Sequence, residues 1–207
     1  RTDFMSVIIA ICGGSCSGKT TLAKRLENRL GADQCLLMRQ DDYYFDMRTL
    51  KFEGDLPNFD HPSTIDFDQL VKDLTTLKHC EPVKPPRYDF TTHHRVFSDE
   101  WVQPKPFIIV EGLLILSHEP LRRIFDYSYY LKCPDLMRLE RRLRRDIADR
   151  GREEAEIRWQ FGAHVRPMHD EYVAPSQAHA QRIIKQAEYM EDIDGLCDSL
   201  IAKWTSA

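Results

Sequence analysis

A glycine-rich segment near the N-terminus carries the pattern G-x-x-x-x-G-K-[ST], followed by a second threonine. Glycines let backbone N–H groups turn inward, and the positive end of a following helix adds to them, so such a loop can hold the β- and γ-phosphates of a nucleotide. Lys19 would supply a point charge to those phosphates, and Thr20 a hydroxyl ligand to Mg²⁺. A glycine-rich turn without a ligand is the alternative. The expected donor-binding residues are Gly13, Gly14, Ser15, Cys16, Ser17, Gly18, Lys19, Thr20 and Thr21.

Acidic side chains follow two further apolar segments. Asp41 and Asp42 come after residues 35–38, and Glu111 comes after residues 107–110. If both segments are parallel strands, these carboxylates collect at the edge where open α/β sheets bind ligands. One carboxylate could accept the proton of an attacking hydroxyl, and another could hold a metal ion or its waters. This equipment indicates a kinase that acts on a small alcohol, although each carboxylate alone could be a surface residue or a helix cap.

Residues 138–152 are rich in arginine, although the whole chain has a net charge of −4. At helical spacing Arg138, Arg142 and Arg145 share one face, opposite an apolar stripe. A solvated helix face is the simpler interpretation. Beside a phosphate-binding loop, guanidinium groups match the oxygens of a transferring phosphoryl group, so we expect a closing lid over about residues 138–160. Gly151 would suit a hinge or tight turn there. The apolar stripe consists of Leu136, Leu139, Leu143 and Ile147.

These residues need a scaffold, which the apolar pattern predicts. Continuous apolar runs at residues 7–12, 35–38, 107–110 and 127–131 are typical of strands buried on both faces of a parallel sheet. Helices are predicted over residues 19–30, from the N-cap Asp66 onward, and over about residues 190–204. Strands separated by helices predict a three-layer α/β fold of the P-loop NTPase type with a central parallel sheet. The proline-punctuated residues 45–106 are expected to form a substrate-binding insertion.

Length and composition limit the function classes. A chain of 207 residues fits a single domain, is too short for a motor or helicase, and has no Asn-Lys-x-Asp segment of the kind that reads guanine in GTPases. The six cysteines form no C-x-x-C pair and are expected to be reduced thiols. No apolar run could cross a bilayer and no secretory leader is visible, so a cytoplasmic protein without a membrane partner is expected. The net negative charge argues against nucleic acid as a partner.

Several short segments, in the same order, make the chain from about residue 7 to residue 176 resemble the uridine-cytidine kinase family, in the group that includes phosphoribulokinase and nicotinamide riboside kinase. They are the glycine-rich loop and residues 40–44, 58–62, 88–90 with His93 and Arg95, 110–112, 145–152 and 165–168. The resemblance implies a kinase that uses ATP and Mg²⁺ to phosphorylate the 5′-hydroxyl of uridine or cytidine. It implies a nucleoside and a nucleotide donor as small-molecule partners, and it leaves assembly into a homo-oligomer open.

The resemblance also implies roles for single residues. Asp41 would be the base that faces the nucleoside hydroxyl, while Thr20, Asp41 and Glu111 would organise Mg²⁺. Asp60 would grip the ribose hydroxyls, because a carboxylate can accept hydrogen bonds from a vicinal diol. His93 would read the pyrimidine edge. Plainer interpretations are a turn cap for Asp60, a solvent-facing ring for His93, and core positions for the tyrosine and phenylalanine of residues 88–90. The other substrate and lid residues implied are Tyr44, Tyr88, Phe90, Arg142, Arg145, Arg150, Arg152 and Gln160, with Lys19, Arg145 and Arg150 catalytic.

Two segments depart from the family pattern. The loop after Asp42 is built differently, which bears on the substrate, and residues 182–187 lack the Pro-Arg-Gly that usually follows the late strand, which bears on the donor base. Two other functions stay open. One is a related kinase for nicotinamide riboside or a sugar phosphate, against which Tyr88, Phe90 and His93 argue. The other is a nucleotide-sensing protein without catalysis, against which the presence of Lys19 and the acidic residues argues.

Overall fold

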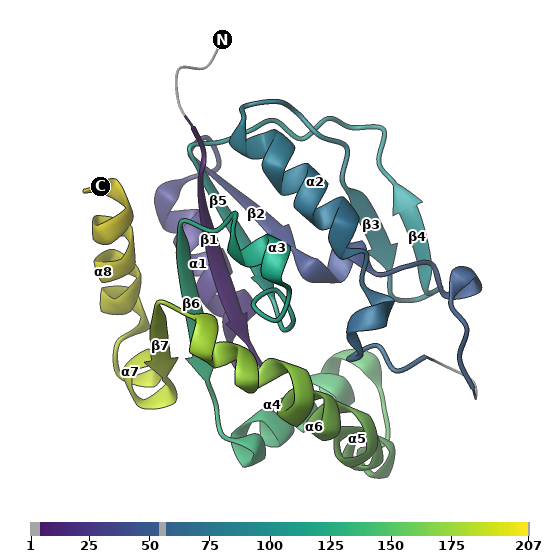
Figure 1. Cartoon of the computed structure of the whole chain (residues 1–207). Coiled ribbons are helices and arrows are strands. Elements are labelled where there is room, and N and C mark those ends of the chain that lie inside the picture. Colours follow the sequence, from purple (N-terminus) through teal and green to yellow (C-terminus); the bar gives the residue numbers. More distant parts are fainter. Residues whose placement is uncertain (1–4, 54–56, 207) are drawn as a thin grey trace.

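The central layer is a sheet of five parallel strands in the order β2-β5-β1-β6-β7 (Figure 1). The computed structural model describes residues 5–53 and 57–206. Four of the strands coincide with the predicted apolar runs. The fifth, which is last in the chain, was not predicted and forms one edge of the sheet. The strands are β1 (Val7–Gly13), β2 (Cys35–Arg39), β5 (Phe107–Gly112), β6 (Tyr127–Lys132) and β7 (Arg182–Lys185).

Helices cover both faces of the sheet, so the predicted three-layer fold is confirmed. In β1, Ile8 and Ala10 pack toward α2 (Phe67–Lys78) and α3 (Glu119–Arg122), whereas Ile9 and Ile11 pack toward α1 (Lys19–Leu30) and α8 (Ile193–Thr205). All four side chains are fully buried. Burial on alternate faces explains why this strand is apolar at every position, and each buried isoleucine contributes roughly 1.5–3 kcal/mol.

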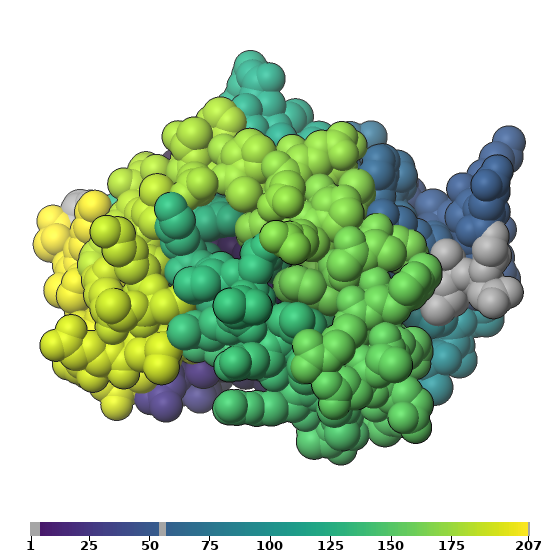
Figure 2. Space-filling model, turned by 90° about the horizontal axis from the view of Figure 1, so that it is seen from below, coloured from purple at the N-terminus to yellow at the C-terminus, as the bar shows by residue number. Residues whose placement is uncertain are grey.

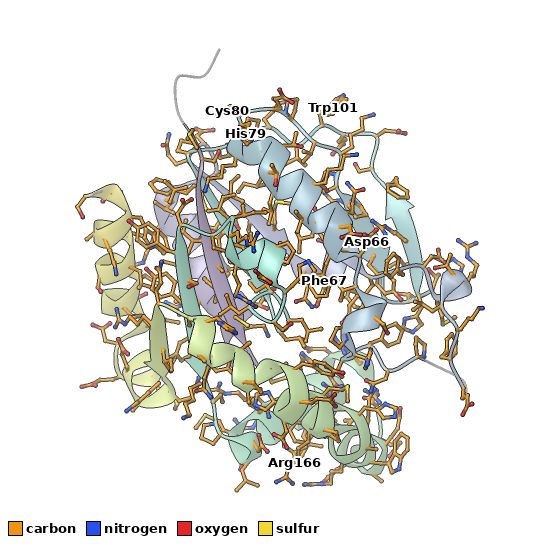
Figure 3. All side chains as sticks on the ribbon, viewed as in Figure 1. Asp66, Phe67, His79, Cys80, Trp101 and Arg166 are labelled. Carbon is orange, nitrogen blue, oxygen red and sulfur yellow. The ribbon has the colours of Figure 1, made fainter. Side chains whose placement is uncertain are left out.

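The predicted insertion, residues 45–106, contains more structure than the single helix expected there. Its helix α2 begins after Asp66, which accepts a hydrogen bond from the Gln69 backbone as predicted for the N-cap. An antiparallel hairpin, β3 (Pro86–Asp89) and β4 (His94–Phe97), lies beside it. Figure 3 labels Asp66 between the helix and the hairpin, where its carboxylate accepts a hydrogen bond from Arg95 of β4 at 2.7 Å. This partly buried ion pair links the hairpin to the start of α2. Short 3-10 turns lie at Gln40–Tyr43, Met47–Thr49 and Pro62–Thr64.

The chain between β6 and β7 is mostly helical and lies across the carboxyl ends of the strands (Figure 1). Figure 2 shows this face of the molecule, over which the green segments of this region spread. Its helices are α4 (Asp135–Arg150), α5 (Glu154–Gln160) and α6 (Arg166–Met168), with π-helical turns at Phe161–Val165 and His169–Val173 and a 3-10 turn at Pro175–His179. Gly151 ends α4 in a left-handed conformation with φ of 60°, as the predicted tight turn requires.

The orientation of α4 differs from what its amphipathic pattern suggests. Its buried residues are Arg138, Arg142 and Asp146, while Leu136 and Ile147 of the apolar stripe are 76% and 45% exposed. An apolar stripe normally faces the core. Here the charged face is turned inward because it lies against the phosphate loop and the cavities described below, where guanidinium groups find polar partners.

The helix predicted over about residues 190–204 is confirmed by α8, which begins three residues later, and a short unpredicted helix precedes it. The two helices, α7 (Gln186–Glu191) and α8, are separated at Asp192. The Asp192 carboxylate accepts a hydrogen bond from the Gly195 backbone at 2.8 Å and so caps α8. Within residues 5–53 and 57–206, no helix is both long and apolar enough to span a membrane.

Candidate active site

The predicted phosphate loop connects β1 to α1 at the carboxyl edge of the sheet. Gly18, just before α1, has a φ of 103°, and Cys16 has a φ of 62°, so the loop turns through left-handed backbone conformations. Lys19 is buried, and its Nζ donates a hydrogen bond to the Gly14 carbonyl oxygen at 3.2 Å. A buried ammonium group that is bonded to a neutral oxygen favours an anionic ligand nearby.

A cavity of about 620 Å³ opens beside this loop. We call it the donor cavity. Three of the nine predicted donor residues do not line it: Gly13 ends β1, the Gly14 carbonyl is bonded to Lys19, and Ser17 is fully buried. These three residues belong to the backbone and interior of the loop and do not face the donor cavity. The predicted residues that do line the donor cavity are Ser15, Cys16, Gly18, Lys19, Thr20 and Thr21.

Two of the predicted carboxylates reach the donor cavity from the ends of β2 and β5. Asp41 and Glu111 both line it, together with Lys19, so the proposed base, the metal-binding acid and the lysine share one opening. The Thr20 hydroxyl donates a hydrogen bond to Glu111 at 3.0 Å. Burial raises the pKa of Glu111, and the Lys19 ammonium group opposes that shift. Asp42 lines neither this cavity nor the one that follows.

A second cavity of about 640 Å³, the acceptor cavity, adjoins the first. Asp41, Arg145 and Arg150 line both cavities. Any group that Asp41 contacts in the acceptor cavity therefore lies next to the phosphate loop. All the predicted substrate residues line the acceptor cavity: Tyr44, Asp60, Tyr88, Phe90, His93, Arg142, Arg152 and Gln160.

Aromatic rings form one side of the acceptor cavity. The ring centroid of Tyr44 lies 5.2 Å from that of Tyr88 and 6.3 Å from that of Phe90, with Tyr88 and Phe90 at 5.1 Å. Phe59 and His93 stack at 5.0 Å with nearly parallel planes. Tyr88 is buried while Phe90 is 47% exposed, so these rings are not simply the core of a strand pair. Such walls suit a planar heterocycle.

Polar groups occupy the far side of the acceptor cavity. Burial raises the pKa of Asp60, and the nearby Arg142 guanidinium opposes that shift. Arg142 donates hydrogen bonds to the Ser15 hydroxyl at 3.2 Å and to the Gln160 side-chain oxygen at 3.0 Å. Arg152 donates to the same Gln160 oxygen at 2.9 Å. The arginines of α4 and the turn after it thus connect the phosphate loop to the acceptor cavity, as expected of a lid.

Comparisons with known proteins agree with this geometry. Residues 8–191 match the family model described as "Phosphoribulokinase / Uridine kinase family". The chain belongs to this family. A uridine kinase of Geobacillus kaustophilus is 40% identical over 87% of this chain and 86% of its own length, and one of Chloroflexus aggregans is 41% identical over 87% of each. A solved structure described as a possible uridine kinase from Bacillus stearothermophilus shares the fold, with a TM-score of 0.64, 21% identity, and coverage of 89% of this chain and 90% of that one.

The family assignment makes this enzyme a P-loop kinase, and its chain offers a site that fits a divalent cation. The Thr20 hydroxyl, the Glu111 carboxylate and the Asp41 carboxylate all face the donor cavity. Hard oxygen ligands of this kind suit Mg²⁺, which usually retains several waters and binds substrate phosphates as well. Among the residues that the structure describes, no cluster of three or more His, Cys, Asp or Glu side chains could hold a metal ion by itself. Phosphates and water would therefore complete the coordination.

Several cavity residues of this kinase were not predicted from the sequence. Arg39 ends β2 in register with Glu111 of β5, and its guanidinium lies 3.8 Å from Glu111 and 3.9 Å from Asp41. Its position before the predicted acids is the signal that could have identified it. Phe59 precedes Asp60, and its ring contacts could have been suspected for that reason. No local signal marks Tyr189 of α7, which reaches the donor cavity through the fold alone. Other unpredicted lining residues are Leu113 and Arg141 in the donor cavity, and Thr91 and Glu156 in the acceptor cavity.

Proposed function

We propose that this kinase transfers the γ-phosphoryl group of ATP to the 5′-hydroxyl of uridine or cytidine and so forms UMP or CMP. The observation that carries the proposal is the position of Asp41 in the shared wall of the donor and acceptor cavities. An alcohol in the acceptor cavity and phosphates at the loop would meet at this carboxylate. The identity of 40% and 41% to two proteins named uridine kinase, over most of their length, supports the choice of acceptor.

Asp41 is proposed to orient the nucleoside hydroxyl and to accept its proton as the oxygen attacks the γ-phosphorus. Phosphoryl transfer needs little covalent help from the protein, so positioning and electrostatic stabilisation dominate. Lys19 approaches from the loop, while Arg145 and Arg150 line both cavities from the lid side. These three cations would stabilise the charge on the transferring group from opposite sides. A Mg²⁺ ion at Thr20, Asp41 and Glu111 would neutralise phosphate charge.

The nucleoside is proposed to lie with its base among the aromatic rings and its ribose toward Asp60. Among the described residues, no side chain donates a hydrogen bond to the Asp60 carboxylate, so its oxygens are available to two ribose hydroxyls. His93 lies at the aromatic end, where its Nε2 could bond the pyrimidine edge while its Nδ1 lies 3.4 Å from the Tyr88 hydroxyl. A sugar phosphate would leave the apolar ring faces without a partner. The aromatic wall therefore favours a nucleoside over that alternative.

Coupled detection of ADP with a panel of alcohols tests the proposal. Uridine and cytidine should be the best acceptors, ahead of nicotinamide riboside and sugar phosphates. Exclusive use of nicotinamide riboside or of a sugar phosphate would contradict the pyrimidine assignment. Binding of ATP and uridine with no product would instead indicate a nucleotide-sensing protein.

Asp41→Asn tests the role of the shared carboxylate. It should retain nucleotide binding and lower turnover by about 10²–10⁴-fold, the usual contribution of a general base. Asp42→Asn is the matched control, because it makes the same change one residue along in a side chain that lines neither cavity. Turnover of the Asp41 variant equal to that of the control would remove Asp41 from this role.

A further inference from the structure

One fully buried carboxylate lies among the lid arginines. Asp146 is 0% exposed and occupies the inward face of α4, one residue after Arg145. Burial of a charge is costly unless it is paired, and a buried ion pair by itself adds little stability compared with apolar side chains of the same size. A stabilising role alone therefore does not account for a carboxylate at this position. Its contacts point to a different role.

Each oxygen of Asp146 faces a different pair of arginines. Oδ1 lies 2.8 Å from Nε of Arg145 and 3.4 Å from a terminal nitrogen of Arg150. Oδ2 lies 3.3 Å from a terminal nitrogen of Arg152 and 3.5 Å from Nε of Arg142. The four positive side chains would repel one another without a central negative charge. One carboxylate therefore gathers all four.

The two pairs also differ in the cavities that they reach. Arg145 and Arg150 line both the donor and the acceptor cavity, whereas Arg142 and Arg152 line the acceptor cavity only. Oδ1 thus holds the arginines at the junction where a phosphoryl group would move, and Oδ2 holds those beside the acceptor. Arg145 is bonded to Asp146 through Nε, which leaves its terminal nitrogens directed elsewhere.

The backbone of Asp146 contributes to the same arrangement. Its carbonyl oxygen accepts hydrogen bonds from the N–H groups of Gly151 and Arg152, which end the helix and turn the chain back. Arg152 therefore returns to within reach of the Asp146 side chain and of Gln160. Arginine side chains have many rotamers, and fixing them before the substrate binds lowers the entropic cost of catalysis.

We propose that Asp146 is a positioning residue that holds the four lid arginines in the geometry needed for phosphoryl transfer, each oxygen serving one pair. It touches no substrate itself and acts through the arginines. This inference rests on the proposed phosphoryl transfer. The Asp146 carboxylate is then the counter-ion of the lid, and it orders the arginines before the phosphoryl group binds.

Asp146→Asn keeps the shape and removes the charge, and Asp149→Asn is the matched control on the exposed side of the same helix. In the Asp146 variant we expect kcat to fall by about 10²-fold and the KM for uridine to rise, by analogy with the loss of other electrostatic contacts in active sites. Affinity for ADP without acceptor should stay within about threefold, because the loop and Lys19 are unchanged. Kinetic constants equal to those of the control would overturn the proposal. So would parallel losses of ADP affinity, uridine affinity and unfolding midpoint, because these indicate a stability role.

Two further measurements keep the test decisive. Trypsin cleavage after Arg150 and Arg152 reports lid order without any acceptor, so it stays valid even if the wild type phosphorylates no nucleoside and the proposed function fails. We expect cleavage of the Asp146→Asn protein to be at least about tenfold faster than that of the control, since released arginines enter the protease more readily; equal rates would refute the proposal. If the Asn variant does not fold, Asp146→Glu keeps the charge and displaces it by one methylene. Turnover at least fivefold lower with normal ADP affinity would support the proposal, and wild-type turnover would overturn it.

Discussion

Asp60 offers the sharpest test of how the acceptor is held. The proposal gives its carboxylate two hydrogen bonds from the ribose, and no described side chain donates a hydrogen bond to it. Asp60→Asn preserves shape, removes the charge and replaces one acceptor oxygen by a donor. A hydrogen bond to a charged group is worth about 1.5–3 kcal/mol, and about 1.4 kcal/mol corresponds to a factor of ten. We therefore expect kcat/KM for uridine to fall by about 10–100-fold.

A cycle of two enzymes and two substrates separates this contact from other effects. Wild type and Asp60→Asn are each assayed with uridine and with 2′-deoxyuridine. In the wild type, loss of the 2′-hydroxyl should cost about tenfold or more in kcat/KM, because Asp60 loses a partner. In the variant the same loss should cost less than about threefold. Asp99→Asn, an exposed carboxylate of the same insertion, should behave as wild type. An equal penalty for the deoxynucleoside in both enzymes would refute the contact.

The pH dependence gives an independent measurement on the same residue. Burial raises the pKa of Asp60. As pH falls, Asp60 is therefore protonated at a higher pH than an ordinary aspartate, and it then loses the negative charge that the ribose hydroxyls need. The acidic limb of the kcat/KM profile should lie above the pH range in which an ordinary aspartate titrates in the wild type, and it should move to lower pH in Asp60→Asn. An acidic limb at the same pH in both enzymes would show that another group is responsible for it.

Three further predictions concern residues at or near the donor cavity, two of them addressing nucleotide binding and one the stability of the fold. Tyr189→Ala should raise the KM for ATP severalfold and leave the KM for uridine unchanged, because Tyr189 lines the donor cavity and not the acceptor cavity. An equal change in both KM values would contradict this. Burial lowers the pKa of His169 to about 4. Below pH 6.5 the unfolded chain therefore binds a proton that the folded chain does not, and the free energy of unfolding measured in urea should fall between pH 6.5 and 4.5. That fall should shrink in His169→Leu and persist in the exposed-site variant His179→Leu. Gly14→Ala places a Cβ within 2.9 Å of His169, so donor affinity should drop, whereas Gly162→Ala meets nothing within 4 Å and should not change it.

Sequence alone could predict the parts of this fold that depend on local chemistry. The loop pattern fixed the positions of β1 and α1, because glycine, lysine and threonine at that spacing require a strand before them and a helix after them. The N-cap Asp66 fixed the start of α2. The resemblance to a family supplied the acceptor residues, since nothing in the spacing of Asp60 and His93 indicates a shared cavity. Their roles stay predictions.

The parts that could not be predicted depend on contacts between distant segments. Tyr189 reaches the donor cavity because α7, which follows β7, lies beside the phosphate loop, where the Tyr189 hydroxyl donates a hydrogen bond to the Gly18 carbonyl oxygen at 3.4 Å. The hairpin β3–β4 has short strands of weak alternation, and its place depends on the ion pair between Arg95 and Asp66. The ion pairs of Arg39 required the register between β2 and β5, which brings Glu111 beside it.

The reversed burial of α4 follows from what the helix covers. Arg138 is fully buried, bonded to Asp135 at 2.5 Å, and its guanidinium lies over the Phe161 ring at 5.5 Å. One turn further along, Arg142 reaches Ser15 of the phosphate loop. A leucine face in this position would bring apolar atoms against phosphates, whereas guanidinium groups provide charge and hydrogen bonds there. Because α4 must order these arginines before a ligand neutralises them, it also needs a buried anion among them. Asp146 is that anion, and the exposure of Leu136 and Ile147 is the consequence of turning the charged face inward.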